Sequence, residues 1–234
     1  MKVKAYVGTS GWLYDWNLGK SLEWYEQNSG LNAIELNSSF YRFPFPNQIK
    51  GWVTKSKEIR WAVKVHRLIT HLRKMNESSF PIWEKFKSIF NPLDYKIDFY
   101  LFQLSPNFQC KEEALRKLSR FREQTRLGER MAVEFRNETC YNEKILEWGK
   151  KEGITLVSVD SPEITWIVKS GKSVYLRLHG RESWYFYDYD ESELRELIES
   201  ALNLSPEKIY IFFNNDHWML ENARKAVSIL KNYT

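Results

Sequence analysis

The segment AIELNSSFYR, residues 33–42, begins as a short apolar run and then turns polar. Ala33, Ile34 and Leu36 are typical of a buried strand, yet Glu35 lies among them and Asn37 follows directly. A buried carboxylate without a partner costs several kcal/mol of folding free energy. Glu35 therefore indicates either a cationic partner or a chemical task at the end of a core strand.

Seven further apolar runs repeat this pattern, and helical or irregular sequence separates each run from the next. The predicted strands are Val3–Val7, Ala33–Leu36, Arg60–Val65, Phe99–Leu104, Met131–Phe135, Thr155–Asp160, Val174–Leu178 and Lys208–Phe213. Eight parallel strands in 234 residues predict an α/β fold, the (β/α)8 TIM barrel. A doubly wound sheet is the alternative, but it usually has fewer strands and a recognisable phosphate-binding turn after the first.

The segments between the strands carry helical signals such as capping residues and apolar residues at helical spacing. The predicted helices cover Ser21–Asn28, Asn47–Ser56, Ser79–Phe86, Glu112–Arg126, Asn142–Glu152, a stretch that starts over Asp190–Arg195, and Leu220–Leu230. The sequence around Pro162 is irregular. Because no Gly/Ser/Pro-rich linker interrupts the chain, residues 1–234 are predicted to form one domain, a monomer by default.

Composition narrows the class of protein. Lys and Arg outnumber Asp and Glu by 35 to 30, a net charge of +5 that is compatible with a phosphate-bearing partner without establishing one. No apolar run approaches the roughly eighteen residues of a membrane span, and the amino terminus leaves no room for a signal peptide. We therefore expect a cytoplasmic protein without a membrane partner. Cys110 and Cys140 lie outside metal-ligand spacing and are expected to be reduced thiols.

Polar residues gather where the predicted strands end. In a barrel, alternate strand residues face inward, and the active site lies at the carboxyl ends. The inward sets inferred from this alternation are Glu35 with Asn37, Lys64 with His66, Leu101 with Gln103, Glu134 with Arg136, Ser158 with Asp160, Tyr175 with Arg177 and His179, and Tyr210 with Phe212 and Asn214. The sequence thus predicts a charged ring at the barrel mouth.

The ring and the loops beside it supply the candidate site. The predicted catalytic residues are Glu35, Glu134, Asp160 and His179. The predicted ligand-binding residues are Thr9, Trp12, Asn37, Tyr41, Lys64, His71, Gln103, Arg136, Arg177, Asn214, Asn215 and Asp216. The alternative is a salt-bridge network that only caps the barrel interior. If the ring is functional, replacing Glu35, Glu134 or Arg177 should abolish ligand binding and leave stability near that of the wild type or higher.

Ordered motifs give a resemblance that covers nearly the whole chain. They are Gly8–Trp12, Glu35–Tyr41, Ala62–Lys64, Ile69–His71, Gln103–Pro106, Val133–Arg136, Asp160, Arg177–Gly180, Phe213–Asp216 and Asn222–Ala223. The chain resembles the YecE-like family, domain of unknown function 72. The resemblance implies a TIM barrel without a settled activity. After Arg136 the family usually has His, a small residue and Trp, whereas this chain has Asn137–Tyr141.

Three functions fit these residues. The first is a metal-assisted hydrolase with Mg²⁺ or Mn²⁺ bound by oxygen and imidazole ligands, by distant analogy to barrel phosphodiesterases that act on damaged DNA. Its ligands would come from Glu35, Glu134, Asp160, His179 and Asp216. A zinc cluster is not expected, because no two of the four histidines have the spacing of a ligand pair on one helix.

The second function is metal-free chemistry. Glu35 and Glu134 have the residue types of a glycosidase pair. Lys64, Arg136 and Arg177 favour an anionic substrate instead, since guanidinium groups match phosphate and carboxylate. Lys64 is also a candidate Schiff-base nucleophile, but we expect its acidic neighbours to keep it protonated.

The third function is non-catalytic binding of nucleic acid. A basic run surrounds His71, with Arg67, Arg73 and Lys74, and the Trp184–Tyr189 loop offers aromatic side chains for stacking on bases. This loop is also predicted to be a flap with Gly180 as its hinge. The sequence as a whole predicts a mouth that binds an anionic, phosphate-bearing ligand, with a hydrolase or phosphodiesterase as the leading function.

Overall fold

The computed structural model describes residues 2–233, and in it eight parallel strands close into a barrel. In spatial order they are β5 (Met131–Glu134), β4 (Ile97–Gln103), β3 (Arg60–Lys64), β2 (Ala33–Leu36), β1 (Lys4–Thr9), β9 (Lys208–Phe213), β8 (Ser173–Leu178) and β6 (Thr155–Asp160). Pairing of β5 with β6 closes the ring. The predicted TIM barrel is confirmed, with each strand end within two residues of its predicted place.

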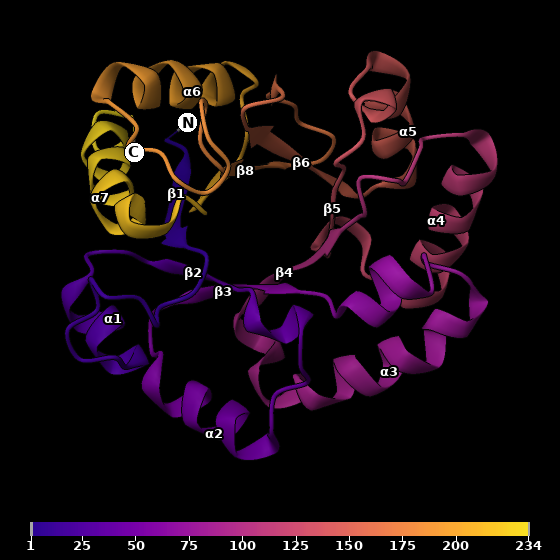
Figure 1. The fold of residues 1–234 in the computed structure, drawn as a ribbon, viewed down its shortest axis with the longest axis horizontal. Coiled ribbons are helices and arrows are strands. Elements are labelled where there is room, and N and C mark those ends of the chain that lie inside the picture. Colours follow the sequence, from indigo (N-terminus) through magenta and orange to yellow (C-terminus); the bar gives the residue numbers. More distant parts are fainter. Residues whose placement is uncertain (1, 234) are drawn as a thin grey trace.

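Within the described residues, 2–233, seven α-helices surround the barrel (Figure 1). They are α1 (Leu22–Asn28), α2 (Pro46–Lys55), α3 (Phe80–Ile89), α4 (Glu112–Thr125), α5 (Glu143–Glu152), α6 (Glu191–Asn203) and α7 (Met219–Leu230). Local sequence sets several helix ends, because Ser21 and Asp190 accept hydrogen bonds from the first turns of α1 and α6. A short antiparallel strand, β7 (Thr165–Trp166), takes the place of a helix between β6 and β8.

Apolar residues inside the barrel complement one another in size. The interior set is Ala33, Ala62, Phe99, Leu101, Ala132, Val157, Val159, Tyr175, Tyr210 and Phe212. Alanines on β2, β3 and β5 leave room for the aromatic rings on β4, β8 and β9. Because alternate residues continue inward along each strand, this packing directs Glu35, Lys64, Glu134 and Arg177 to the mouth.

Strand β1 runs two residues beyond its predicted end at Val7 because Gly8 is part of the sheet. A Cβ atom at Gly8 would lie 2.3 Å from the Ala33 carbonyl oxygen, closer than any side chain tolerates. The glycine therefore serves close packing between β1 and β2, and the turn begins at Ser10.

Strand β6 departs from the predicted alternation. Val157 and Val159 face the interior, so Ser158 and Asp160 point outward. Ser158 bonds the backbone of Val168, and Asp160 accepts a 2.5 Å hydrogen bond from Thr165. The connection after β6 is not helical, so its backbone N–H and C=O groups lack the hydrogen bonds that a helix would provide internally. Ser158 and Asp160 point outward and form hydrogen bonds with this connection instead. Asp160 is therefore not part of the inward ring.

The two cysteines form a disulfide, which corrects the expectation of reduced thiols. Cys110 lies in the loop after β4, and Cys140 lies in a short 3₁₀ turn, Glu138–Cys140, after β5. Sequence spacing could not show this pairing, because the Cα atoms, 30 residues apart in the chain, come within 5.2 Å only when the neighbouring strands pair. Within residues 2–233, no helix is long and apolar enough to cross a membrane.

Candidate functional site

Arg177 lies at the centre of the barrel mouth and joins two acidic strand ends. Its Nε donates to Glu35 Oε2 at 2.9 Å, its Nη2 donates to Glu35 Oε1 at 2.6 Å, and its Nη1 donates to Glu134. All three side chains are fully buried. Burial alone would lower the pKa of Arg177, but the carboxylates of Glu134 and Glu35 outweigh it and raise that pKa. The guanidinium is a permanent cation with every charge partner already in place.

Both carboxylate oxygens of Glu35 already accept hydrogen bonds from protein groups. Besides the two bonds from Arg177, it accepts from Ser10 Oγ at 2.9 Å and from the Tyr175 hydroxyl at 2.6 Å. Burial and the neighbouring Glu35 carboxylate raise the pKa of Tyr175 well above its usual value, so the phenol remains a donor. The predicted ligand set omitted Ser10 and Tyr175. Tyr175 shares the strand face of Arg177, and that alternation was the available signal.

Glu134 accepts from both sides of the mouth. Its Oε1 lies 2.6 Å from Arg136 Nε, 3.3 Å from Gln103 Nε2 and 3.2 Å from His179 Nε2. Burial would raise the pKa of Glu134, but Arg136 and Arg177 hold it well below the usual range. The carboxylate is therefore ionised at neutral pH and cannot act as a proton donor there.

His179 is a neutral imidazole. Burial, followed by the positive charges of Arg136 and Arg177, lowers its pKa well below the usual value. Its Nε2 lies 3.2 Å from Glu134 Oε1 and 3.1 Å from Arg136 Nη2, and its Nδ1 lies 3.2 Å from Asn214 Nδ2. Trp184 covers the ring at a centroid distance of 5.5 Å, and His179 is fully buried.

Lys64 differs from the arginines around it. It is only 9% exposed, yet within residues 2–233 its Nζ has no hydrogen bond and no acidic partner. The ammonium lies 4.4 Å from the ring centroid of Phe40. Burial lowers the pKa of Lys64 to about 7, Arg177 adds to this effect, and Glu134 and Glu35 only partly oppose it. The expectation that acidic neighbours keep Lys64 protonated is thus corrected, because arginines already neutralise those carboxylates.

The rim beside Lys64 comes from the turns after β2 and β3. His71 lies in a π-helical turn, Leu68–Leu72, and its ring is nearly perpendicular to the Phe40 ring, with the centroids 5.0 Å apart. Burial and the charge of Lys64 lower the pKa of His71. Asn37 has a buried Oδ1 without a hydrogen-bond partner, and Tyr41 is 67% exposed. Phe40 thus lies between Lys64 and His71, while Asn37 and Tyr41 line the neighbouring groove.

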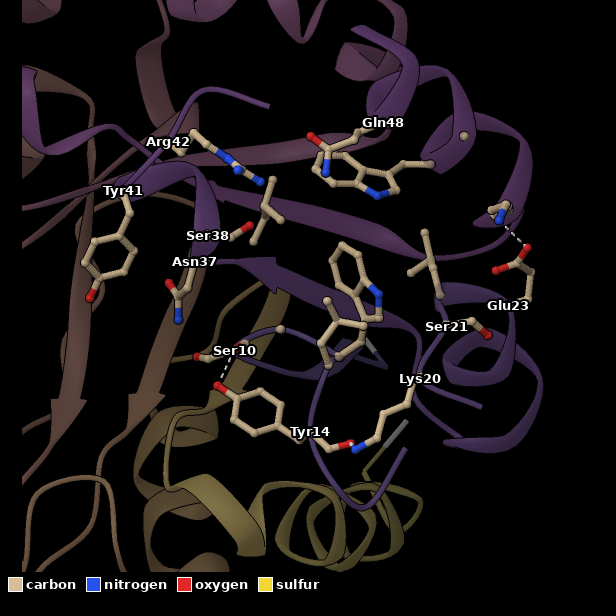
Figure 2. A pocket seen from close by; sticks show the side chains of 18 of the residues that line it. Ser10, Tyr14, Lys20, Ser21, Glu23, Asn37, Ser38, Tyr41, Arg42 and Gln48 are labelled. Carbon is tan, nitrogen blue, oxygen red and sulfur yellow. Dashed lines mark hydrogen bonds and ion pairs between the residues drawn. The ribbon is translucent and has the colours of Figure 1, made fainter. Parts of the chain in front are cut away.

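A groove of about 820 Å³ opens beside this rim, between the β1–α1 loop and α2. Figure 2 shows Tyr14, Asn37 and Tyr41 at one end of it and Lys20 and Glu23 at the other. Its lining also contains Trp12, Leu13, Leu36, Trp52 and Arg42. Trp12 forms part of the floor, packed edge-on against Trp52. The groove joins an aromatic surface to the polar mouth.

Four predicted site residues lie away from this space. Thr9 is fully buried on the outer face of β1, where its Oγ1 lies 3.1 Å from the hydroxyl of Tyr25. Asp160 accepts from Tyr189 at 2.7 Å and pairs with Arg181 at 3.5 Å. The other two lie after β9: Asn215 donates to the Tyr187 carbonyl oxygen, and Asp216 is 3.7 Å from His217 at the surface. Thr9, Asp160 and Asn215 thus fix the loops around the mouth.

The predicted metal site has no matching ligand set. Within residues 2–233, no three His, Cys, Asp or Glu side chains gather as a metal-binding group. A metal ion at Glu35 or Glu134 would have to displace a guanidinium that already bonds both of them. The donors around these carboxylates fit an ion-pair network and do not fit a Mg²⁺ or Mn²⁺ centre.

The chain is similar in sequence and in fold to known proteins. A family model described as "Protein of unknown function DUF72" matches residues 6–233, and no curated protein matches the chain. A DUF72 family protein from Thermotoga maritima is 26% identical, with a TM-score of 0.85 and coverage of 97% of this chain and 99% of the other. One from Enterococcus faecalis is 23% identical, with a TM-score of 0.84 and coverage of 97% and 95%.

A more distant likeness is to a xylose isomerase domain containing protein from Salmonella typhimurium. It is 12% identical, with a TM-score of 0.63 and coverage of 90% of this chain and 93% of the other. At that identity the likeness shows the barrel fold alone. A shared fold does not determine function, so the chemistry of the mouth depends on its own residues.

Proposed function

The chain belongs to the DUF72 family, as its YecE-like motifs predicted, and because that family has no assigned function we propose one from the site itself. We propose that the barrel mouth binds an anionic, phosphate-bearing ligand. One observation carries the proposal: within residues 2–233, Lys64 is a buried cation that lacks an acidic partner. A buried charge without a partner is costly, and a ligand anion would supply the partner.

The charges of the mouth support this assignment. Glu35 and Glu134 carry two negative charges, and Arg177 and Arg136 balance them. Protonated Lys64 leaves the mouth with an excess positive charge. Arg136 follows β5, is 10% exposed and lies 4.6 Å from the ring centroid of Trp184. Arg136 and Lys64 are the cations that we assign to the ligand.

Hydrolysis is the reaction that we propose for the bound ligand. His71 supports it, because its lowered pKa leaves the imidazole neutral at pH 7 and able to accept a proton from water. Its Nδ1 lies 2.9 Å from Thr70 Oγ1, which leaves Nε2 for the ligand side. We assign Glu35 and Glu134 a positioning role, since they hold the guanidinium groups of the mouth in place. A glycosidase pair needs one carboxyl group with a raised pKa, and Glu134 shows the opposite shift.

Titration calorimetry with inorganic phosphate tests the binding step. Wild-type protein should bind phosphate saturably, and Lys64→Met and Arg136→Met should each weaken binding tenfold or more. Lys208→Met is the matched control, because Lys208 begins β9 at the opposite end of the barrel and should leave binding unchanged. Absence of saturable binding, or equal binding by Lys64→Met, would refute the proposed site. Assays with p-nitrophenyl phosphate and its bis ester then test hydrolysis separately.

A nucleic-acid strand is the second candidate ligand. Tyr185 is 44% exposed and Phe186 is 62% exposed, next to the Trp184 ring that covers Arg136. Exposed aromatic rings beside a cation are the usual platform for single-stranded bases. A labelled oligonucleotide should lose affinity with rising salt and with Phe186→Ala. If phosphate does not compete with the oligonucleotide, the strand does not use this mouth.

We further propose that the protein is a cytoplasmic monomer. The disulfide is the observation against that location, since such bonds are rare in cytosolic proteins other than those of hyperthermophiles. Alkylation of thiols in intact cells before lysis would test it. Complete blocking of both cysteines would show a reduced protein in the cell.

A further inference from the structure

Neighbouring residues fix the backbone of Lys64 and confine its amine, as expected for a reactive group. Leu36 on β2 is in register with Val63 on β3, so Asn37 and Lys64 lie side by side at the mouth. The Ser39 hydroxyl lies 2.6 Å from the Lys64 carbonyl oxygen and 3.0 Å from that of Leu36, which fixes the lysine backbone against the turn after β2. Phe40 forms one wall beside the amine.

The amine is accessible as well as confined. The Nζ atom of Lys64 makes no hydrogen bond, yet it is not among the fully enclosed polar atoms, so it is reached from the mouth. Arg177, Arg136 and Arg181, the other cations around the mouth, each have a carboxylate partner. Within residues 2–233, Lys64 has no such carboxylate partner.

We propose that Lys64 forms an imine with an aldehyde or ketone that also carries an anionic group. The neutral amine donates its electron pair to the carbonyl carbon, and one amine proton moves to the carbonyl oxygen to give a neutral carbinolamine. The hydroxyl then takes a proton from solvent and leaves as water, and the nitrogen lone pair forms the C=N bond of the protonated imine, so no oxidant or reductant is needed. The anionic part of this ligand rests on the proposed function, with Arg136 as its partner, whereas imine formation itself does not.

The charges around Lys64 leave its amine partly neutral. The titratable groups that face it are Arg177, Glu134, Glu35, Arg136 and His71. Burial and the two arginines favour the neutral amine, while the two carboxylates and the Phe40 ring favour the ammonium. With a pKa of about 7, about half of the amine is neutral at pH 7, against roughly one part in three thousand for an ordinary lysine.

Reductive trapping tests the inference. The probes are pyridoxal 5′-phosphate, an anionic aldehyde, and pyridoxal, which has the same aldehyde without the phosphate. Each is added at substoichiometric concentration, reduced with borohydride, and located by peptide mass mapping. Lys64 should be labelled at least tenfold faster than any exposed lysine at pH 7, and its rate should rise with pH to a plateau just above pH 7. Because this profile is measured on the wild type, it does not depend on how a variant folds.

The two probes separate the inference from the proposed function. Preferential labelling by both probes at equal rates would support the imine and refute anion binding at this site. Labelling of Lys64 no faster than of exposed lysines by either probe would overturn the imine, while phosphate calorimetry would still test anion binding. Lys64→Met should lose the fast adduct, and Lys208→Met should retain it.

Discussion

Arg177 carries its charge inside the barrel, where neither it nor the two carboxylates that it bonds touch solvent. A buried ion pair contributes little net stability against a well-packed apolar replacement, but removal of one member leaves the others uncompensated. The predicted ring therefore consists of two parts. Glu35, Glu134 and Arg177 form a buried support, while Lys64 and Arg136 face the ligand.

Replacement of Arg177 by Met should destabilise the protein by about 3–5 kcal/mol, because Glu35 and Glu134 lose their shared cation. This revises the expectation that such a variant keeps near wild-type stability. Urea unfolding measures the change. Arg195→Met is the control, since its pair with Glu191 is on the surface, where solvent screens it, and its loss should change stability little. Equal stability of the two variants would contradict the burial of the network.

Lys64 should lower the free energy of unfolding of the wild type near neutral pH. Its pKa is about 7 in the folded protein and 10.5 when exposed, so the unfolded chain binds more protons between these values, and wild-type stability rises with pH across them. Lys64→Met should therefore be more stable than wild type at pH 7, by on the order of 1–3 kcal/mol, and the difference should shrink by pH 10. Urea unfolding at both pH values checks this, and a constant difference would contradict it.

At the scale of elements, the loop from Gly180 to α6 covers the mouth. Tyr189 holds both ends of it, because its hydroxyl donates to Asp160 and accepts from the Gly180 N–H at 2.8 Å. Trp184 from the same loop lies over His179 and Arg136. Asp160, predicted as a catalytic residue, thus lies in a position that anchors the flap.

Gly180→Ala should displace this loop. Gly180 has a φ of 106°, and an added Cβ would lie 2.3 Å from the Ser183 carbonyl oxygen. The expected loss of stability is about 1–3 kcal/mol, together with faster hydrogen exchange over residues 180–189. Gly51→Ala is a contrasting variant, because that helical position has open space and the change should stabilise the protein by about 0.5–1 kcal/mol. Unchanged exchange in Gly180→Ala would show that the loop tolerates a side chain there.

The disulfide joins the loop after β4 to the turn after β5. Closing a loop of 30 residues restricts the unfolded chain, so reduction should cost roughly 3–4 kcal/mol and lower the Tm. A Cys110→Ser, Cys140→Ser double variant should have the Tm of the reduced wild type, and reductant should not change that Tm. Melting of the wild type that is insensitive to reductant would argue against the bond.

At the scale of the whole molecule, barrel closure brings distant charges together. Glu35 and Arg177 are 142 residues apart in the chain and meet only because β2 and β8 belong to one closed sheet. Aromatic rings and alanines fill the barrel interior below Glu35 and Arg177, so these two side chains lie at the carboxyl end of the barrel. The site is thus a property of closure, since no single strand or helix contains it.

The sequence by itself determined the eight strands and the place where chemistry would lie. Alternation along each strand is a local property, and the carboxyl ends of parallel strands converge in any closed barrel, so Glu35, Lys64, Glu134 and Arg177 were predictable at the mouth. The irregular stretch around Pro162 was equally visible in the residues, because it lacks helical spacing.

Only the tertiary structure decided which charges are paired. Partner choice depends on register and burial across strands far apart in sequence, and these placed Arg177 between two carboxylates and left Lys64 without one within residues 2–233. The same reason applies to Asp160, which turns outward because the connection after β6 needs polar partners, and to the disulfide, whose cysteines approach only when β4 and β5 pair.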